Sequence, residues 1–377
     1  TRATTFEMRI MHIYWFTGRS LKDLCSTTQA SLASGLIKRG YELTFVNPDE
    51  SGSHADWPWE HQSIQFEALP GLRSRTLGRK MRTWFEQDDS KTESVALVDW
   101  RIANALVPLF RLRNIPWILI DRSPPADKGI LSFLQWPSWK RSWRLVRANS
   151  AARGCVVSQK HQEFVQKKTD VKASSITVLP AGVNLELFQP STRFSKLTMV
   201  YHGRLDLHRG VLALPMLLQK VKKSGLDARL IMIGDGDSME GLRSMAAEND
   251  DFEIHSTLQQ DALAEIISRC HIGLLPMPEN KMWAIASPLK RSEYAASGLL
   301  IFGIDHAGHR FSTNDSLDWM KLVKQYDFHD DGVKWLNNLD EQQIEQLSIQ
   351  ARTYAEENLS WEHTLDSLEQ TILTLVN

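Results

Sequence analysis

The sequence predicts an α/β protein made of two doubly wound, Rossmann-like domains in series. Short apolar runs alternate with helical patterns along all 377 residues. The runs are continuous, which is typical of strands buried on both faces of a parallel sheet. They fall into two successive groups, and each group is large enough for one doubly wound sheet. The length also suits two domains of ordinary size.

The predicted strands follow in chain order. In the first half they are Ile10–Tyr14, Leu43–Val46, Val95–Val98, Trp117–Ile120, Cys155–Val157 and Ile176–Leu179. In the second half they are Leu197–Tyr201, Leu230–Ile233, Phe252–Ile254, Ile272–Leu275 and Leu299–Phe302. The polar stretch Phe188–Lys196 is the predicted boundary, which gives domains of residues 1–190 and 191–360. Residues 361–377 are predicted to form a terminal helix.

Composition places the chain among globular proteins of a reducing compartment. Apolar residues make up 42% and charged residues 24% of the sequence, which is typical of soluble domains. No run of eighteen apolar residues occurs, so we expect no membrane-spanning helix, and residues 1–7 lack the apolar stretch of a signal peptide. Three scattered cysteines, Cys25, Cys155 and Cys270, fit neither a disulfide framework nor a metal site. We therefore expect a cytoplasmic protein.

The net charge of −1 conceals an asymmetry. Residues 1–190 hold 26 Lys and Arg against 18 Asp and Glu, so the remainder is acidic. Nine of the 13 tryptophans also fall in the first half. A basic, Trp-rich half joined to an acidic half predicts different partners for the two.

The most informative segment is a strand-to-helix corner at residues 203–210, Gly-Arg-Leu-Asp-Leu-His-Arg-Gly. Arg204 and Arg209 can converge on one anion there, and Gly203 allows close approach of the backbone. The helix that follows offers free N–H groups and a positive dipole end. The corner therefore suits a pyrophosphate, although an ordinary turn with two solvated arginines has the same pattern. Gly234 follows the next strand, and parallel strands place such turns at one sheet edge.

A second segment, residues 287–298, predicts a helix that carries charged groups to the same edge. Ser287 is a candidate N-cap and Pro288 fits the first turn. Lys290 and Glu293 share a helical face, and Gly298 is placed to end the helix. Lys290 and the free N–H groups suit phosphate, and Glu293 could accept two ribose hydroxyls. A surface helix with a tolerated ion pair is the alternative.

Together with residues 178–190, Val-Leu-Pro-Ala-Gly-Val-Asn…Phe-Gln-Pro, these segments resemble the retaining GT-B glycosyltransferases of glycosyltransferase family 4. The resemblance spans nearly the whole chain and includes the closing Ser-Trp-Glu at residues 360–362. It implies GT-B architecture, two Rossmann-like domains with an interdomain cleft. The first domain would bind the acceptor, the second would bind the donor, and the last helix would return to the first domain.

The resemblance implies a retaining glycosyltransferase that moves a sugar from a nucleoside-diphosphate sugar to a lipid-linked or glycan acceptor. Arg204 and Arg209 would stabilise the leaving diphosphate. The implied donor-binding residues are Gly18, Gly203, Gly234, His255, Leu258, Ser287, Pro288, Leu289, Lys290 and Glu293. No metal or other cofactor is implied. A sugar-nucleotide 2-epimerase of the same fold and a catalytically weakened sugar-nucleotide-binding protein are the alternatives.

Four positions depart from the family pattern. One glycine, Gly18, stands where a pair is usual, and Asp121 replaces a usual histidine. Asp121 could accept a sugar hydroxyl, orient the acceptor, or pair structurally with Arg122. Ile285 stands where the first of two glutamates is expected, and the nearby Glu279 is either a substitute or a plain loop charge. The fourth change, arginine for lysine at Arg209, keeps the charge and adds a bidentate fork.

Two further patterns bear on partners. Asp235-Gly236-Asp237 resembles a metal motif, but turn and capping roles explain these aspartates better. Tryptophans at helical spacing beside bases favour contact with an anionic membrane through Trp136, Trp139, Lys140, Trp143 and Arg144. The alternative is that the tryptophans pack on the sheet and the bases face water. Basic residues of segment 73–82 add to the charge, and no nucleic-acid motif accompanies them.

Overall fold

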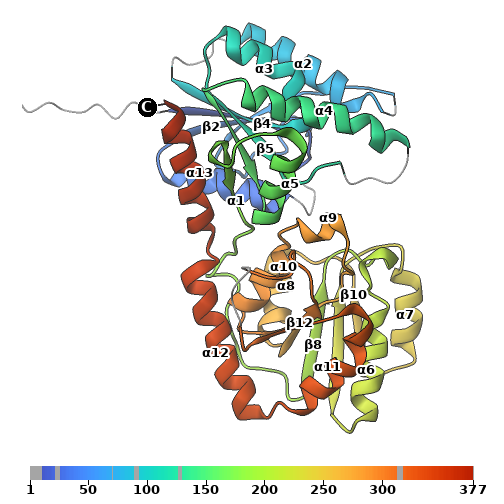
Figure 1. Ribbon diagram of the computed structural model, residues 1–377. Coiled ribbons are helices and arrows are strands. Elements are labelled where there is room, and N and C mark those ends of the chain that lie inside the picture. The colour runs from blue at the N-terminus through green and yellow to red at the C-terminus, as the bar shows by residue number, and fades with distance from the viewer. Residues whose placement is uncertain are drawn as a thin grey trace, which may run out of the picture. The chain divides into compact units, whose positions relative to one another are not determined.

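The computed structural model describes residues 11–21, 26–69, 71–88, 93–125, 130–311 and 317–376. They form two compact units, each built on one parallel sheet (Figure 1). Unit 1 comprises Thr1–Pro180 and Trp361–Asn377, and unit 2 comprises Ala181–Ser360. The predicted α/β class with two doubly wound sheets is confirmed.

Unit 1 contains a parallel sheet with the strand order β3-β2-β1-β4-β5-β6-β7. Its strands are β1 (His12–Phe16), β2 (Glu42–Asn47), β3 (Glu60–Ser63), β4 (Ser94–Asp99), β5 (Trp117–Asp121), β6 (Ala152–Val156) and β7 (Ile176–Val178). Its helices are α1 (Thr27–Lys38), α2 (Arg73–Gln87), α3 (Trp100–Leu112), α4 (Ile130–Arg147), α5 (Gln159–Thr169), the 3-10 turn η2 (Ala173–Ser175) and α13 (Trp361–Val376).

Helices cover both faces of this sheet, which is why its strands read as continuous apolar runs. On one face the buried residues of α2, α3 and α4 form a core with Tyr14 and Phe16 of β1. On the other face α1 and α13 pack over Ile13 and Trp15 of the same strand. Figure 1 shows α2, α3 and α4 as one layer of unit 1 and α13 beside α1.

Unit 2 contains a parallel sheet with the order β10-β9-β8-β11-β12-β13. Its strands are β8 (Leu197–His202), β9 (Ala228–Ile233), β10 (Phe252–His255), β11 (Ile272–Leu275), β12 (Leu300–Ile304) and β13 (Met320–Val323). Its helices are η3 (Leu207–Arg209), α6 (Ala213–Lys223), α7 (Met239–Ala247), α8 (Gln260–Ser268), α9 (Lys281–Ala284), α10 (Leu289–Ala296), η4 (Gln325–Asp327), α11 (Phe328–Asn337) and α12 (Glu341–Asn358).

Each predicted strand is present in the described residues, with ends shifted by at most three positions; Ile10 lies outside them. Two edge strands were not predicted. β3 reads Glu-His-Gln-Ser and β13 reads Met-Lys-Leu-Val, and both are largely half-exposed. These two edge strands expose most of their side chains, so the apolar run by which the other strands were predicted is missing.

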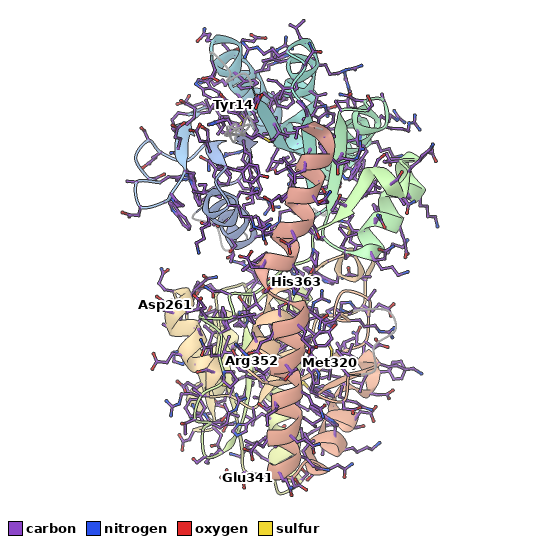
Figure 2. The ribbon with its side chains drawn as sticks, turned by 90° about the vertical axis from the view of Figure 1, so that its left-hand side faces the viewer. Tyr14, Asp261, Met320, Glu341, Arg352 and His363 are labelled. Carbon is purple, nitrogen blue, oxygen red and sulfur yellow. The ribbon has the colours of Figure 1, made fainter. Side chains whose placement is uncertain are left out.

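The predicted boundary at Phe188–Lys196 needs correction, because the two units divide at Pro180–Ala181. Val183 and Phe188 are buried in the unit 2 core. Arg352 of α12, labelled in Figure 2, donates hydrogen bonds to the carbonyl oxygens of Leu185, Phe188 and Ala296. The polar stretch is therefore tied to unit 2 by backbone contacts that its composition does not reveal.

The terminal helix α13 belongs to unit 1. Arg39, the C-cap of α1, donates to Glu362 and Asp366 at 2.7 and 2.6 Å and also to Glu369. Leu365, Leu368 and Ile372 are buried against α1 and the sheet. Across the ranges given above, no helix is both long and apolar enough to cross a membrane.

Candidate functional site

Two glycines bring the ends of β8 and β9 into direct contact in unit 2. Gly203 has φ +116° and Gly234 has φ +144°, values that residues with a side chain rarely adopt. A Cβ on Gly234 would lie 1.8 Å from the carbonyl oxygen of Gly203. The two turns after these strands therefore pack backbone against backbone, at the carboxyl edge where doubly wound sheets bind ligands.

The two predicted arginines converge on one carboxylate of the same turn. Arg204 donates to Asp206 with Nη2–Oδ1 at 2.9 Å and Nε–Oδ2 at 3.2 Å. Arg209 brings Nε to 3.6 Å from Oδ2 of the same residue. Burial acts to raise the pKa of Asp206, but the hydrogen bond from Arg204 and the nearby Arg209 outweigh it and lower that pKa. We call Gly203, Arg204, Asp206, Arg209 and Lys290 the anion corner.

Arg209 is positioned by an indole that the sequence did not single out. Its guanidinium lies 4.7 Å from the ring centroid of Trp283, and its Nη1 lies 3.9 Å from the Met277 sulfur. Trp283 belongs to α9, whose N-cap is Asn280. The His208 ring lies parallel to the indole with centroids 6.0 Å apart. Arg209 is consequently more buried than Arg204: its side chain is 23% exposed, against 52% for Arg204.

Lys290 adds a buried cation beside the corner. It lies in the first turn of α10, and its Nζ is 4.1 Å from the Tyr201 ring centroid. A Cβ on Gly203 would approach that Nζ to 3.2 Å. Burial and the charge of Arg209 lower the pKa of Lys290 to about 7, although Glu293 acts in the opposite direction. The charge of Lys290 therefore responds to what binds near it.

Glu293 lies one turn further along α10 and is also buried. Its Oε2 is 3.0 Å from Nε2 of His202, the last residue of β8. Gly298, with φ +66°, follows the end of the helix as predicted. The predicted N-cap role of Ser287 is wrong, because Pro288 is the N-cap and Leu289 is the first helical residue. Ser287 Oγ instead accepts hydrogen bonds from Ala181 N and Arg291 Nη2.

The remaining predicted donor-side residues lie at the ends of β9 and β10. His255 ends β10, and its Nε2 is 2.6 Å from Glu253 Oε1. Leu258 packs half-buried against the unit 2 core. Asp235 accepts hydrogen bonds from Thr257, and Asp237 accepts one from Leu207 N. Both aspartates thus support turns, and nowhere in the described ranges do three or more acidic, His or Cys side chains form a group that could hold a metal ion.

Asp121 has a structural environment in unit 1, not the exposed position that contact with a sugar requires. It is 1% exposed and accepts hydrogen bonds from Trp139 Nε1 at 2.6 Å and Trp143 Nε1 at 2.9 Å. His161 Nε2 lies 3.5 Å from the same carboxylate oxygen. The expectation that Asp121 touches substrate is therefore corrected: its carboxylate anchors two indoles within the core.

The same contacts correct the membrane role of the tryptophans. Trp139 and Trp143 are fully buried, and half-buried Trp136 packs on Trp139 and Phe164. A Cβ on Gly154 of β6 would lie 2.1 Å from the Trp143 ring, so this glycine makes room for the indole. The alternative interpretation, tryptophans on the sheet and bases toward water, is the one observed. Arg144 is exposed and Lys140 half-buried.

Gly18 lies in a turn fixed by a residue that sequence analysis missed. Asp99, which ends β4, accepts hydrogen bonds from Thr17 Oγ1 at 2.6 Å and Gly18 N at 3.2 Å. Burial raises the pKa of Asp99, although the Thr17 hydrogen bond opposes the rise. Asp99, Asp206, His202 and Trp283 carry no spacing signal of their own. Asp99 and His202 could have been found only as polar residues that end buried strands.

Ile285 and Glu279, the two residues in question in the acidic segment, have different environments. Ile285 is 7% exposed and belongs to the buried apolar residues. Glu279 is exposed and lines a pocket at the ends of β12 and β13. Glu279 therefore lies in a different environment from Ile285, in the lining of that pocket.

Comparisons with known proteins agree with this architecture. The model of Glycosyltransferase Family 4 matches residues 26–187. No curated protein matches the sequence. Among solved structures, sucrose-phosphate synthase from Thermosynechococcus elongatus is similar, with a TM-score of 0.74, 14% identity, and coverage of 97% of this chain and 99% of that one.

Two more solved structures are similar over nearly their whole lengths. HepE of Anabaena, in complex with UDP and glucose, gives a TM-score of 0.72 at 10% identity, covering 97% of this chain and 100% of that one. WaaG, a glycosyltransferase involved in lipopolysaccharide biosynthesis, gives 0.67 at 12%, covering 95% and 99%. The chain therefore has the two-domain GT-B fold of these solved structures along its length, and the match to the Glycosyltransferase Family 4 model lies in its N-terminal half.

Proposed function

We propose that the protein is a retaining glycosyltransferase that takes a sugar from a nucleoside-diphosphate sugar bound to unit 2. The observation that carries this proposal is the anion corner. Two guanidinium groups converge on one carboxylate, and a buried lysine lies beside them at the carboxyl ends of parallel strands. Arg204 uses only two of its five N–H donors on Asp206. A diphosphate can therefore bind beside that carboxylate without a rearrangement of the turn.

The other donor contacts follow from this placement. Gly203 would let phosphate approach the backbone beside Lys290 Nζ, and Gly234 would support that turn by packing against the Gly203 carbonyl. Ser287, Pro288 and Leu289 lead into α10, whose first N–H groups are free to meet negative charge. Glu293 would accept the ribose hydroxyls, and the backbone near His255 and Leu258 would contact the base. The complex of HepE with UDP supports a uridine nucleotide as the first donor to test.

The chemistry requires stabilisation of the leaving diphosphate. The bond from the anomeric carbon to the phosphate oxygen breaks while the acceptor hydroxyl forms a new bond on the same face. The leaving phosphate takes the proton of that hydroxyl, so no protein nucleophile is needed. Arg204, Arg209 and Lys290 would supply fixed positive charge where negative charge develops, which is usually the largest contribution an enzyme makes.

The test is substitution of each arginine separately by alanine. We expect Arg204→Ala and Arg209→Ala to lower kcat by roughly 100- to 1,000-fold with little change in Tm, while the exposed control Lys334→Ala in α11 keeps full activity. Proton NMR of the first product formed should show that the transferred sugar has the same anomeric configuration as in the donor. An inverted product would contradict retention. An epimer formed from donor alone would favour the 2-epimerase, and near-normal turnover by both variants would remove the corner from the mechanism.

For the acceptor, we propose a lipid-linked or glycan molecule presented at an anionic membrane surface to unit 1. The supporting observation is the outer surface of the layer α2, α3 and α4. These helices contain eleven Lys and Arg and one acidic residue, Glu86. Phe133 of α4 is 77% exposed within this layer, and Leu72 precedes α2 at 45%. Basic charge with scattered exposed apolar groups suits anionic headgroups.

Vesicle flotation tests this part separately. Each base near an anionic surface contributes about 1 kcal/mol, so the triple variant Arg75→Gln/Arg79→Gln/Arg144→Gln should weaken binding to phosphatidylserine-containing vesicles by more than roughly 100-fold. The matched control is Lys223→Gln/Lys321→Gln/Lys334→Gln, which removes three exposed charges from unit 2. Equal loss in both triple variants, or equal binding to neutral phosphatidylcholine vesicles, would contradict the proposed surface.

A further inference from the structure

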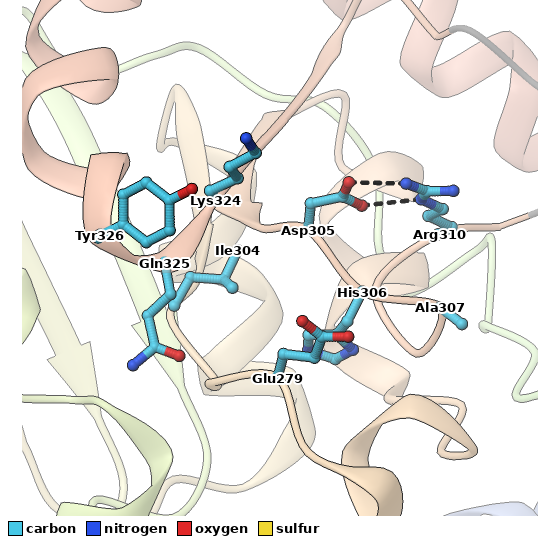
Figure 3. A pocket seen from close by; sticks show the side chains of 9 residues that line it. All are labelled: Glu279, Ile304, Asp305, His306, Ala307, Arg310, Lys324, Gln325 and Tyr326. Atoms are coloured by element: carbon cyan, nitrogen blue, oxygen red, sulfur yellow. Dashed lines mark hydrogen bonds and ion pairs between the residues drawn. The ribbon is translucent and has the colours of Figure 1, made fainter.

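A pocket of about 800 Å³ opens at the carboxyl ends of β12 and β13 in unit 2. Figure 3 shows its lining, which comes from the segments after β11, β12 and β13. The lining residues are Glu279, Ile304, Asp305, His306, Ala307, Arg310, Lys324, Gln325 and Tyr326. The volume lies within the range of ligand pockets, roughly 300–1,000 Å³. None of the anion-corner residues lines it, so it is a separate feature of the same sheet edge.

Met277 connects this pocket to the anion corner. Arg209 Nη1 contacts the Met277 sulfur from the corner side. His306, which is 4% exposed and lies in the pocket wall, brings Nε2 to 3.2 Å from the Met277 carbonyl oxygen. Since β11 alone lies between β8 and β12, the pocket and the corner are separated along the sheet edge by one strand. A ligand that occupies the pocket would therefore adjoin a diphosphate held at the corner.

The charges of the lining balance. Glu279 and Asp305 oppose Arg310 and Lys324, and Arg310 is already paired with Asp305 through two hydrogen bonds of 2.8 and 2.7 Å (Figure 3). Burial lowers the pKa of His306, with the Met277 hydrogen bond and Glu279 opposing, so its imidazole is neutral near pH 7. A strongly charged ligand would leave part of this lining uncompensated, whereas an uncharged polar ligand would not.

The lining also offers both hydrogen bonding and a flat apolar surface. Glu279 accepts hydrogen bonds, Gln325 donates and accepts them, and Lys324 donates them. The Tyr326 side chain is 79% exposed, and Lys324 Nζ lies 5.9 Å from its ring centroid. An exposed aromatic ring among carboxylate and amide groups matches a sugar ring, which has an apolar C–H face and a rim of hydroxyls.

We propose that this pocket binds an uncharged sugar unit next to the anion corner. This inference rests on the proposed function for its biological meaning. Two sources can supply the unit: the transferred sugar of the donor, or a sugar residue of a glycan acceptor. Both present the same ring face and hydroxyls, so the pocket chemistry is shared and the source is decided by experiment.

The first experiment needs no transfer reaction. Saturation-transfer NMR with free glucose, galactose, mannose and N-acetylglucosamine should show binding of at least one sugar to the full-length protein. Tyr326→Ala and Glu279→Gln should weaken that signal at least threefold. The controls Met245→Ala in α7 and Glu265→Gln in α8 change an exposed apolar and an exposed acidic residue of the same unit and should leave it unchanged. Absence of signal for all four sugars, or equal signals from every variant, would overturn the proposal.

The second experiment assigns the source. If the pocket holds the donor sugar, Tyr326→Ala weakens binding of UDP-glucose, or of whichever sugar nucleotide the protein accepts, by about tenfold and leaves binding of the free nucleoside diphosphate unchanged. If it holds an acceptor residue, the KM for acceptor rises about tenfold and donor binding is unchanged. Unchanged constants for both substrates would overturn the proposal. A protein that binds free sugar here but transfers none would refute the proposed function and leave the pocket assignment intact.

Discussion

The α-carbon of Gly234 faces the carbonyl oxygen of Gly203 so closely that a Cβ there would lie 1.8 Å from that oxygen. Both residues also have a positive φ that disfavours any side chain. Arg204 follows Gly203 directly. The position of the arginine therefore depends on two glycines from different strands, one of which lies some thirty residues further along the chain.

Gly234→Ala should consequently destabilise unit 2 and disturb the anion corner. Overpacking and the unfavourable φ together should cost roughly 2–4 kcal/mol. Urea unfolding measures this cost, and nucleoside-diphosphate binding measured by calorimetry should weaken in parallel. Gly241→Ala is the matched control: its Cβ would meet no atom within 4 Å in helix α7, so we expect a gain of roughly 0.5–1 kcal/mol. Equal stability of the two variants would contradict the close packing.

Asp121 should prove structural. Asp121→Ala leaves the indole N–H groups of Trp139 and Trp143 buried without an acceptor, at about 1–3 kcal/mol each. Asp121→Asn keeps one carbonyl oxygen and should lose less stability. Chemical unfolding, followed by tryptophan fluorescence, measures both. An Asp121→Ala protein of normal stability that has lost transfer would restore a direct role in the reaction.

Lys290 should make nucleotide binding pH-dependent. Its pKa in the free protein is about 7, lowered by burial and Arg209, and a bound diphosphate will raise it. Binding therefore takes up a proton. Affinity is greatest below pH 7 and falls as pH rises through 7 toward the pKa of the complex, by at most about tenfold per unit. Calorimetry in buffers of different ionisation enthalpy measures the proton uptake.

Lys290→Met is the control for this pH dependence. It should bind nucleotide weakly with no proton uptake attributable to Lys290. The free variant should also be more stable, because the native lysine has a lower pKa folded than unfolded and is penalised below its unfolded value. As pH rises from 7 toward 10, that penalty decreases, and the stability difference between variant and wild type should shrink. Proton uptake that persists in the variant would assign it to another group.

Arg39 should hold α13 against α1. Arg39→Met leaves Glu362, Asp366 and Glu369 close together without their shared cation. These acids are partly exposed, so we expect a loss of only about 1–2 kcal/mol at low salt. In 1 M NaCl the loss should shrink because screening weakens the repulsion. Arg82→Met, which removes a single exposed pair with Glu86, should cost at most about 0.5 kcal/mol. A salt-independent loss would point to packing rather than charge.

The sequence by itself determined the central strands, both glycine turns, the end of α10 at Gly298 and the convergence of Arg204 and Arg209. These are local properties: a strand covered on both faces must be apolar throughout, and a turn with positive φ needs glycine wherever it occurs. Edge strands β3 and β13 lack that double cover, so their residues carried no such signal.

Only the tertiary structure determined which residues each face of a helix or strand contacts. Tryptophans at helical spacing in α4 fit a membrane and a sheet equally well, and the space left by Gly154 together with the Asp121 acceptor settles the question. Likewise, Arg352 ties Leu185 and Phe188, at the start of the predicted boundary, to unit 2, and Asp206 and Trp283 orient the arginines. The reason is that side-chain periodicity specifies one face of an element, whereas the partner of that face comes from residues distant in the chain.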